Sequence, residues 1–519
     1  MKPTPLGVWV LLWMGIAACT TRSTAPVERV IAPWTAVLAP SGGESHRGLA
    51  VPTATSTLPP LAGISPTRVP GQPYPTPTPD AIRTPPPVRT EDELYVVQPG
   101  DSLGVIASIF GVSPALIAQS NGLVSPDWIP VWSLLRIPPP SLRSPGPSYK
   151  LIPDSSLVNG PPSVYSNVDT DLAAYSGYLS IYMEEVDGQV LSGAQIVQLV
   201  AEQYSVSPRL LLALLEHQSG WVTRRALSEA EQAYPLGFVN ATYSGLHSQL
   251  SWAANLLNYG YYRWRAGWAG PYALPDGSSV PPGPGVNAGT VAVQSFFATL
   301  LPYAEWERAV QPGGFEQTYA SLFGDPFAVE LDPLVPPGLQ QPELQLPFEP
   351  GKVWSFTGGP HSAWGSGSGW AALDFAPPGN ALGCVLSDEW VTAVADGLVL
   401  RSRNGEVLLD LDGDGYEQTG WVVLYMHIDS RDRVEAGRRL MAGDRIGHPS
   451  CEGGVSDGTH VHLARKYNGE WIPADAELRF NLDGWISSGT GIQYDGTLDR
   501  GEVSLEACSC RNDQNQVSR

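Results

Sequence analysis

Apolar residues recur with a helical period in the middle of the chain. Residues 194–200 and 210–215 both carry apolar side chains at positions i, i+3 and i+4, which places them on one face of a helix. Two later segments, 250–265 and 287–301, can supply further helices. The pattern therefore predicts a mainly α-helical domain over residues 150–340.

Residues 93–140 carry a mixed pattern. The residues that follow Tyr95 predict a strand, and the next apolar run predicts a helix that Asp101 or Ser102 can cap. Ser113-Pro114 is typical of the start of a second helix, because proline is tolerated in a first helical turn. A closing strand near residues 135–138 completes a small βααβ unit.

Two apolar segments farther along, 407–411 and 421–427, flank a stretch of aspartate and glycine and predict a β-hairpin. The connecting turn offers three carboxylates that resemble the start of a calcium loop: Asp410, Asp412 and Asp414. Position twelve of an EF-hand loop would be Trp421, where that pattern requires glutamate. We therefore favour a plain turn over a calcium site.

The first residues of the chain have the pattern of a secretory signal peptide. Lys2 precedes an apolar run at 8–18, which is too short to span a bilayer and has the length of a signal-peptide core. The run ends in Ala17-Ala18-Cys19, which resembles the lipobox of bacterial lipoproteins. That resemblance implies a signal peptide over residues 1–18 and lipidation of Cys19, because two or three acyl chains give stable anchoring. A plain signal peptide followed by a coincidental cysteine is the alternative.

Residues 19–92 are rich in Pro, Thr, Ser and Ala. Such a segment buries too little apolar area to offset the entropy of ordering, and its prolines favour extended conformations. We expect a disordered stalk between the lipid anchor and the folded domains.

The charge of the chain narrows its possible partners. Acidic residues number 51 against 30 basic ones, which gives a net charge of −21. Binding to a phosphate backbone depends on clustered Lys and Arg, and the sequence shows no basic groove. The composition therefore argues against nucleic acid as a partner.

Five side chains in the C-terminal third can form a hydrolytic metal site: His361, Asp374, His427, His460 and His462. Side chains of a strand alternate between its faces, so the His-x-His pair points to one side. A catalytic zinc site needs three N or O ligands and an open fourth position, and His361, Asp374 and His462 can supply the ligands. His427 and His460 would then remain free to handle protons and stabilise an oxyanion. The alternative is a set of ordinary half-buried histidines.

Residues 345–512 resemble the lysostaphin-type zinc metalloendopeptidases, and within them the LasA or beta-lytic branch. The resemblance rests on the long interval between His361 and Asp374 and on the downstream His-x-His pair. It implies a mainly antiparallel β domain with one catalytic Zn²⁺ on His361, Asp374 and His462, and with His427 and His460 as catalytic residues. It also implies a substrate, the peptide cross-links of bacterial peptidoglycan. Three aromatic residues are candidates to line the substrate groove: Trp364, Trp370 and Tyr425.

Residues 95–138 resemble a LysM module. The resemblance rests on several segments, among them Tyr95-Val-Val-Gln-Pro-Gly-Asp101 and Asn121-Gly-Leu123. It implies binding to glycans that contain N-acetylglucosamine, through the loops before the first helix and after the second. The residues expected at these contacts are Gly100, Asp101, Ser102, Asn121, Gly122 and Leu123. The alternative is that the module binds no glycan and serves only as a folded spacer.

The helical domain carries its own candidate for chemistry. Glu216-His-Gln-Ser219-Gly220 is similar to the Glu-Ser-Gly corner of lysozyme-like lytic transglycosylases, which implies Glu216 as a general acid. The serine lies three positions after the glutamate instead of directly after it, so the match is imperfect. A degenerate glycan-holding domain and an unrelated helical spacer are the alternatives.

Four cysteines besides Cys19 lie in the C-terminal region and allow three pairings: Cys384, Cys451, Cys508 and Cys510. We favour a disulfide between Cys384 and Cys451, because a tether there would brace the His-x-His strand. Cys508 and Cys510 would then pair with each other or stay free.

Together these features predict an extracytoplasmic, lipid-anchored zinc endopeptidase that a LysM module targets to peptidoglycan. The expected fold is multidomain, with the βααβ module, a mainly α, possibly lysozyme-like middle domain and a mainly antiparallel β domain at the C-terminus. Two rival functions remain open: a wall-binding scaffold without catalysis, and a glycan-cleaving enzyme that uses the middle domain.

Overall fold

The computed structural model describes residues 88–97, 101–123, 129–164, 166–267, 270–379 and 381–519, which all belong to one compact unit. The predicted signal peptide, Cys19, most of the predicted stalk and Gly100 lie outside the described residues. Of the helices that fall within these ranges, none is both long enough and apolar enough to cross a membrane.

The βααβ unit has the predicted order. Its strands β1 (Glu93–Val96) and β2 (Leu134–Ile137) pair antiparallel and are joined by α1 (Leu103–Phe110) and α2 (Pro114–Asn121). Ser113 caps α2, because its side chain accepts a hydrogen bond from the backbone N–H of Leu116. A small core of apolar side chains from both helices and β2 holds the unit together.

Four long helices dominate the middle region: α5 (Gly193–Tyr204), α6 (Pro208–Ser219), α8 (Leu246–Ala266) and α9 (Ala288–Leu300). Shorter helices surround them: α3 (Asp154–Leu157), α4 (Val168–Leu172), α7 (Glu229–Ala233), α10 (Tyr303–Ala309) and α11 (Phe315–Phe323). Four 3-10 turns complete the helical set: η1 (Pro161–Ser163), η2 (Tyr178–Ile181), η3 (Ala241–Tyr243) and η4 (Pro326–Val329). Two short hairpins join them: β3 (Met183–Val186) with β4 (Gln189–Ser192), and β5 (Tyr272–Ala273) with β6 (Ser279–Val280).

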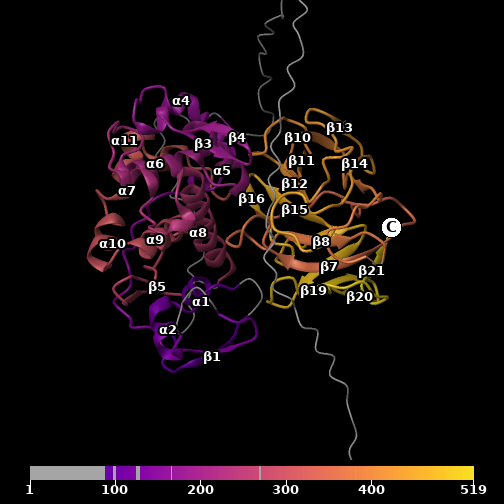
Figure 1. The fold of residues 1–519 in the computed structure, drawn as a ribbon, viewed down its shortest axis with the longest axis horizontal. Coiled ribbons are helices and arrows are strands. Elements are labelled where there is room, and N and C mark those ends of the chain that lie inside the picture. Colours follow the sequence, from indigo (N-terminus) through magenta and orange to yellow (C-terminus); the bar gives the residue numbers. More distant parts are fainter. Residues whose placement is uncertain (1–87, 98–100, 124–128, 165, 268–269, 380) are drawn as a thin grey trace, which may run out of the picture. The chain divides into compact units, whose positions relative to one another are not determined.

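Local sequence explains where these helices begin. Ser192 and Gln195 form a capping box at the start of α5, and Pro208 occupies the first turn of α6. The apolar run 210–215 is buried on all sides, so α6 lies inside the helical region (Figure 1). The two helices that the apolar period predicts are present as α5 and α6, and segments 250–265 and 287–301 supply the further helices α8 and α9.

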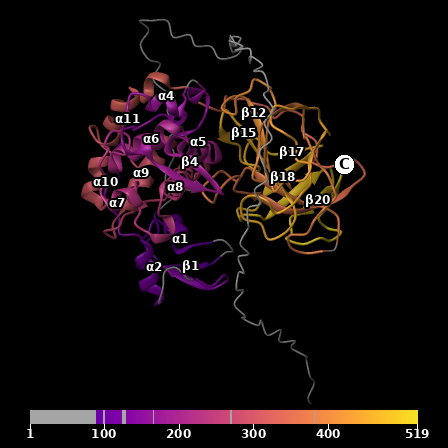
Figure 2. The same cartoon turned by 45° about the horizontal axis from the view of Figure 1, so that its top comes forward.

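The C-terminal region is built on a nine-stranded antiparallel sheet with the order β13-β10-β11-β12-β15-β8-β7-β21, to which β16 adds beside β15. Its strands are β7 (Val353–His361), β8 (Ala372–Ala376), β10 (Gly397–Arg403), β11 (Glu406–Asp410), β12 (Trp421–Met426), β13 (Arg439–Leu440), β15 (Val461–Tyr467), β16 (Glu470–Trp471) and β21 (Gln516–Ser518). A four-stranded sheet follows, with β17 (Asn481–Leu482), β18 (Trp485–Gly489), β19 (Gly496–Arg500) and β20 (Val503–Glu506) (Figure 2). A small pair joins β9 (Val391–Thr392) to β14 (Arg445–Gly447). The multidomain fold predicted from the sequence is confirmed.

Both faces of the large sheet are buried in its centre. Val423 and Tyr425 of β12 belong to the core of the β domain, whereas Val422 and Leu424 pack into the core of the helical region. Ala464 on β15 also packs into the helical core. Because side chains of a strand alternate, this pattern means that the helical region covers one face of the sheet.

Candidate active site

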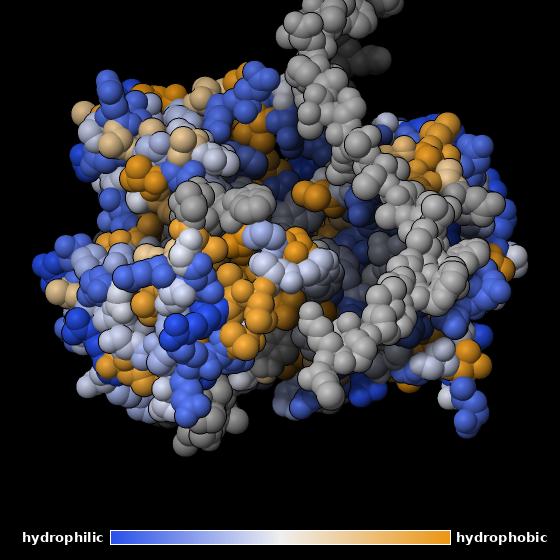
Figure 3. Space-filling model, turned by 60° about the horizontal axis from the view of Figure 1, so that its bottom comes forward, coloured by the Kyte–Doolittle hydropathy of each residue, from blue (hydrophilic) through white to orange (hydrophobic). Residues whose placement is uncertain are grey.

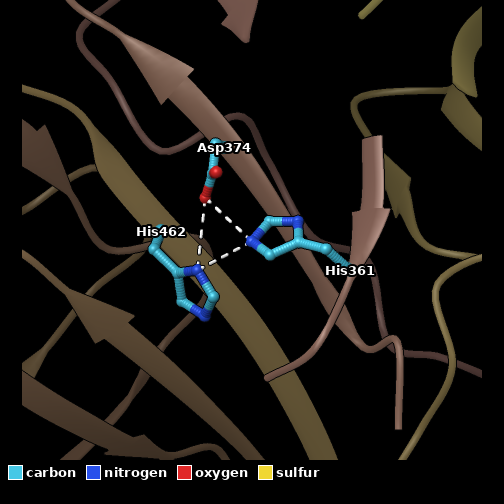
Figure 4. Close-up of side chains that lie close together, drawn as sticks. All are labelled: His361, Asp374 and His462. Carbon is cyan, nitrogen blue, oxygen red and sulfur yellow. Dashed lines mark hydrogen bonds and ion pairs between the residues drawn. The ribbon is translucent and has the colours of Figure 1, made fainter. Parts of the chain in front are cut away.

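The metal-ligand candidates converge on that helix-facing side of the sheet. Asp374 on β8 lies directly opposite His462 on β15, and His361 ends the neighbouring strand β7. Two register irregularities in β7, between Phe356 and Gly358 and between Gly358 and His361, bend its end. The three side chains therefore point toward one another from three adjacent strands (Figure 4).

Three ring nitrogens surround one oxygen of Asp374. Its Oδ1 atom is 3.3 Å from Nε2 of His361 and 3.2 Å from Nδ1 of His462, and these two nitrogens are 3.0 Å apart (Figure 4). Nε2 of His460 lies 3.7 Å from the same oxygen. Asp374 Oδ1 is buried and meets no hydrogen-bond donor in suitable geometry among the described residues.

The protonation of the ligand histidines is fixed by backbone carbonyls. Nδ1 of His361 donates to the carbonyl oxygen of Gly359 at 2.7 Å, and Nε2 of His462 donates to the carbonyl oxygen of Ala363 at 3.0 Å. A carbonyl only accepts, so in the neutral form of each ring the opposite nitrogen carries the lone pair, and this nitrogen faces Asp374. Two lone pairs and a carboxylate in mutual contact repel one another unless a cation lies between them. This donor set fits zinc, which takes N and O ligands and whose ligand histidines donate their other nitrogen to such partners.

The electrostatics of the cluster agree with a cation site. Burial alone would raise the pKa of Asp374, but positive charge on the nearby His361 and His460 outweighs burial and holds that pKa well below its ordinary range, so the carboxylate is stabilised by a positive neighbour. Burial lowers the pKa of His462. Burial, followed by repulsion from His460 and His462, lowers the pKa of His427 to about 3. His427 and His462 are therefore neutral at neutral pH, as ligation and proton acceptance require.

The two predicted catalytic histidines lie side by side next to the ligands. His427 directly follows β12 with a φ of 63°, and the centre of its ring is 4.5 Å from that of His460. Nδ1 of His427 donates to the carbonyl oxygen of Glu452 at 3.0 Å, and Nδ1 of His460 donates to that of Gly458 at 2.7 Å. In the neutral form of each ring, Nε2 is therefore the nitrogen that can accept a proton. The left-handed backbone of a non-glycine residue such as His427 is typical of functional sites.

Several of these contacts could not be predicted from the sequence. The four carbonyl groups that orient the histidines leave no signal, because every residue has one. Tyr494 was not expected at the site, yet its ring stacks on that of His361 with centres 4.2 Å apart. A single tyrosine far along the chain gives no pattern that would reveal this contact.

The expected disulfide between Cys384 and Cys451 is present, and Cys508 pairs with Cys510. Cys451 lies between two residues that hold the catalytic histidines. The backbone N–H of Ser450 donates to the carbonyl oxygen of His427 at 2.7 Å, and the next residue but one, Glu452, accepts from the ring of His427. The disulfide therefore fixes the segment that supports the catalytic pair.

A groove of about 370 Å³ adjoins this segment. Its lining comes from both the β domain and the helical region: Asp187, Gln203, Trp364, Asn404, Glu452, Gly453 and Gly454. The expectation that Trp364 lines a groove agrees with this structure. The expectation for Tyr425 is wrong, because Tyr425 is fully buried and its hydroxyl oxygen accepts a hydrogen bond from the N–H of Val394.

Glu216 at the end of α6 is engaged in structural hydrogen bonds. Its carboxylate accepts from the backbone N–H groups of Val222 and Thr223, both at 3.0 Å, and from the Thr223 hydroxyl at 2.6 Å. These bonds tie the helix end to the turn that follows it. This is the arrangement of a structural cap.

The predicted glycan-contact residues that the structure describes lie at the end of α2 and just before α1. Asn121 uses its side-chain amide to bond the backbone of Ile117 and Arg136, and Gly122 ends α2 with a φ of 61°. Ser102 accepts from the N–H of Val105 at the start of α1, Asp101 accepts from the Tyr95 hydroxyl, and Leu123 packs on the module's core. Exposed apolar side chains are also present on this module: Leu94, Val96, Val131, Trp132 and Leu134. Figure 3, which brings the lower part of Figure 1 forward, shows apolar side chains gathered at the surface.

The predicted hairpin turn joins β11 and β12, which pair antiparallel. The carboxylate oxygens of Asp410, Asp412 and Asp414 lie within 4.8 Å of one another. Asp410 accepts from the N–H groups of Gly413 and Gly415, so it stabilises the turn. Burial and the adjacent Asp410 raise the pKa of Asp412 to about 6.

Parts of this chain match two domain models and two curated relatives. The LysM domain model matches residues 95–138, and the model of the LasA N-terminal domain matches residues 150–336. Protease LasA from two strains of Pseudomonas aeruginosa is 26% identical over 291 residues, which cover 52% of this chain and 65% of the relative. The chain thus spans slightly less than two thirds of the length of these curated relatives.

Solved structures give weaker similarities. The M23 metalloprotease pseudoalterin is 22% identical, and the match covers 35% of this chain and 99% of that one with a TM-score of 0.28. The catalytic domain of lysostaphin from Staphylococcus simulans is 22% identical over 23% of this chain and 87% of that domain, with a TM-score of 0.17. The chain is therefore similar in sequence to Protease LasA, and two of its segments match the models of the LasA N-terminal domain and of the LysM domain.

Proposed function

We propose that this chain is an extracytoplasmic zinc endopeptidase that hydrolyses peptide cross-links of peptidoglycan. The observation that carries the proposal is the convergence of His361, Asp374 and His462, whose ligand atoms lie within 4.8 Å of one another on three adjacent strands. The other nitrogen of each histidine ring is held by a backbone carbonyl, so both rings are oriented for ligation.

The chemistry divides between the metal and the unligated histidines. Zinc held by these three residues supplies Lewis acidity, which lowers the pKa of water to about 7 and polarises a carbonyl oxygen. His427 and His460 hold Nδ1–H against carbonyl groups, so Nε2 of either ring can accept a proton and return it to the leaving amine. The low pKa of His427 keeps that ring neutral and ready to accept at neutral pH.

The groove beside His427 supports a peptide with small side chains. Gly453 and Gly454 form part of its lining, and Gly454 lies next to the His427 ring, because a Cβ built on it would be in ordinary van der Waals contact with Cε1 at 3.5 Å. A substrate residue without Cβ likewise lets the peptide backbone approach the catalytic groups closely. This favours cross-links with glycine next to the cleaved bond.

The remaining parts of the chain direct the enzyme to its substrate. We infer that the LysM domain binds the glycan strands of peptidoglycan, with contacts near Gly100, Asp101 and Ser102 and near residues 121–123. A lipid on Cys19 would hold the protein at the membrane surface, with no other contact to the bilayer. The net charge of −21 speaks against a nucleic-acid partner.

Digestion of purified sacculi by the zinc-loaded full chain tests the proposal. We expect new free amino groups from cleaved peptides, identified by mass spectrometry of the released fragments, and no such groups with an Asp374→Ala variant. New reducing ends that persist in that variant would instead indicate a glycan-cleaving enzyme. Wall binding without either product would indicate a scaffold.

A further inference from the structure

The segment between the first two ligands, residues 362–371, controls the third ligand. The carbonyl oxygen of Ala363 accepts the Nε2–H of His462, and this bond leaves Nδ1 of His462 facing Asp374. The segment folds back on itself, because the N–H of Ala363 donates to the carbonyl oxygen of Gly369 at 3.1 Å. Its position therefore sets the orientation of a metal ligand.

The amino-acid composition of this segment does not by itself favour one fixed conformation. Residues 365–369 read Gly-Ser-Gly-Ser-Gly, which in isolation is the composition of a flexible linker. Bonds within the segment fold it, among them Trp364 N–H to the Ser368 hydroxyl at 2.9 Å and Ala363 N–H to the carbonyl oxygen of Gly369. Its two ends are held from the β region, where Gln493 Nε2 donates to the Ser362 hydroxyl at 3.1 Å and Ala474 N–H donates to the carbonyl oxygen of Trp370 at 2.7 Å. The middle of the segment, residues 365–367, needs a support of its own.

Helix α8 of the helical region supplies this support through Asn255. Its Oδ1 accepts the N–H of Gly367 at 2.8 Å, and its Nδ2 donates to the hydroxyl of Ser366 at 3.2 Å. One amide thus holds two consecutive residues of the segment. The N–H of Trp471 on β16 donates to the hydroxyl of Tyr262 on the same helix at 2.9 Å, which joins α8 to the sheet as well.

The three glycines of the segment permit this close approach. A Cβ at Gly367 would overlap the carbonyl oxygen of Asn255, and one at Gly369 would come within 3.0 Å of the Tyr262 ring. A Cβ at Gly365 would lie 3.0 Å from the ring of Tyr204. Asn255 and Tyr262 are seven positions apart and so share one face of α8. The glycine repeat is therefore explained by contact with the helix rather than by flexibility.

We propose that Asn255 is a positioning residue for the metal site, and that the LasA-type helical region is a structural part of that site. Asn255 holds residues 366 and 367, the bonds of Ala363 to Gly369 and of Trp364 to Ser368 fold the segment around them, and the carbonyl group of Ala363 in this segment orients His462. The inference rests on the proposed metal site but not on the reaction that the site performs. Partners that orient a metal ligand typically change metal affinity by about 10- to 100-fold when they are removed.

Zinc affinity of the purified full chain, measured by competition with a chelator, tests the inference without an activity assay. We expect Asn255→Ala and Gly367→Ala to bind zinc about tenfold more weakly than the parent chain, although every ligand is intact. Asn255→Asp keeps an oxygen that accepts from Gly367, and the Ser366 hydroxyl can donate to the new carboxylate. This variant should therefore retain most of the affinity of the parent.

Two controls separate positioning from loss of stability. Asn167→Ala likewise removes two side-chain hydrogen bonds of an asparagine, here both accepted from backbone N–H groups at the start of α4 and outside the segment, and should lower the melting temperature without changing zinc affinity. Gly104→Ala adds a Cβ on α1, where its nearest neighbour is 3.8 Å away, and should leave zinc affinity unchanged while it raises the melting temperature slightly, because alanine favours a helix more than glycine does.

The zinc-binding and cleavage results distinguish the positioning role of Asn255 from the proposed peptidase function. Zinc affinity equal to that of the parent in folded Asn255→Ala and Gly367→Ala would overturn the inference. A parent chain that binds zinc, loses affinity in these variants and yet cleaves no peptide would sustain the inference and overturn the proposed function. A parent chain with no zinc affinity would overturn both.

Discussion

His462 and Asp374 lie directly opposite each other on two neighbouring antiparallel strands, with Nδ1 of His462 3.2 Å from Oδ1 of Asp374. Opposite residues of such a pair have their side chains on the same face of the sheet. The register of β8 against β15 therefore brings together two ligands that are 88 positions apart in the chain. A shift of that register by one residue would turn His462 to the other face and remove the site.

The distinction between ligands and catalytic histidines can be tested by substitution. His462→Ala and Asp374→Ala should lose both bound zinc and turnover, because each removes a ligand. His460→Ala should retain zinc and lose about 100- to 10,000-fold in turnover, the contribution typical of a general acid or base. Metal content by mass spectrometry and amine release from sacculi give the two readouts. Loss of zinc from the His460 variant would show that the ligand assignment is wrong.

Zinc should stabilise the folded chain. A ligand that binds only the folded state at about 100 times its dissociation constant adds about 3 kcal/mol to the free energy of unfolding. We expect the melting temperature of chelator-treated protein to rise when zinc is restored. Asp374→Ala serves as the control and should show no such rise. An equal rise in that variant would place the stabilising metal elsewhere in the chain.

The Cys384–Cys451 disulfide should matter for both stability and turnover. It closes a loop of 67 residues, so its removal in Cys384→Ser/Cys451→Ser should cost about 4 kcal/mol in the chain-entropy model. Turnover should fall more than zinc content, because Ser450 and Glu452 on either side of Cys451 hold His427, whereas the ligands lie on other strands.

The matched control is Cys508→Ser/Cys510→Ser. Those two cysteines are separated by only two positions, so their bond restricts the unfolded chain very little. Chemical denaturation and metal analysis of both variants provide the comparison. Unchanged turnover in the Cys384→Ser/Cys451→Ser variant, together with lowered stability, would contradict the supporting role of the disulfide.

A buried network of charged side chains on the helix-facing side of the sheet should make the free energy of unfolding depend on pH in the acidic range. Burial would raise the pKa of Glu417, but Arg401 at 2.6 Å and Lys466 at 2.7 Å outweigh burial and lower that pKa from 4.5 to about 2. A lowered pKa stabilises the folded state above the unfolded value. This contribution, about 3 kcal/mol, is therefore lost as the pH falls from about 4.5 toward 2.

The test is the urea unfolding midpoint measured across this pH range. Glu417→Gln should be less stable at neutral pH, because Lys466 is left buried beside an uncharged partner. It should also lose less stability on acidification than the parent chain. Equal acid dependence of the two proteins would show that Glu417 does not titrate as described.

Glu216 should prove structural. Glu216→Gln weakens the bonds to Val222 and Thr223, and we expect a loss of about 1–2 kcal/mol in the free energy of unfolding. Release of amines from sacculi should persist, and reducing ends should be absent with both proteins. Reducing ends that the parent produces and the variant does not would assign glycan cleavage to the helical region.

The sequence by itself determined the βααβ unit, the main helices and the candidates for metal ligands. The apolar period places α5 and α6 correctly, and the His-x-His pair points to one side of its strand as alternation requires. Such patterns are local, because they arise from the repeat of a helix or strand over a few neighbouring residues. The disulfide between Cys384 and Cys451 also followed from its expected place beside that strand.

Only the tertiary structure decided which residues contact each face of these helices and strands. Tyr425 was a candidate for the groove and lies in the core, while Gln203, 161 positions from Trp364, lines that groove with it. The Gly-Ser-Gly-Ser-Gly segment has a linker's composition and is held by Asn255, 112 positions away from Gly367. Contacts at such separation depend on the packing of whole domains, and no periodic pattern along the chain encodes which helix covers which face of a sheet.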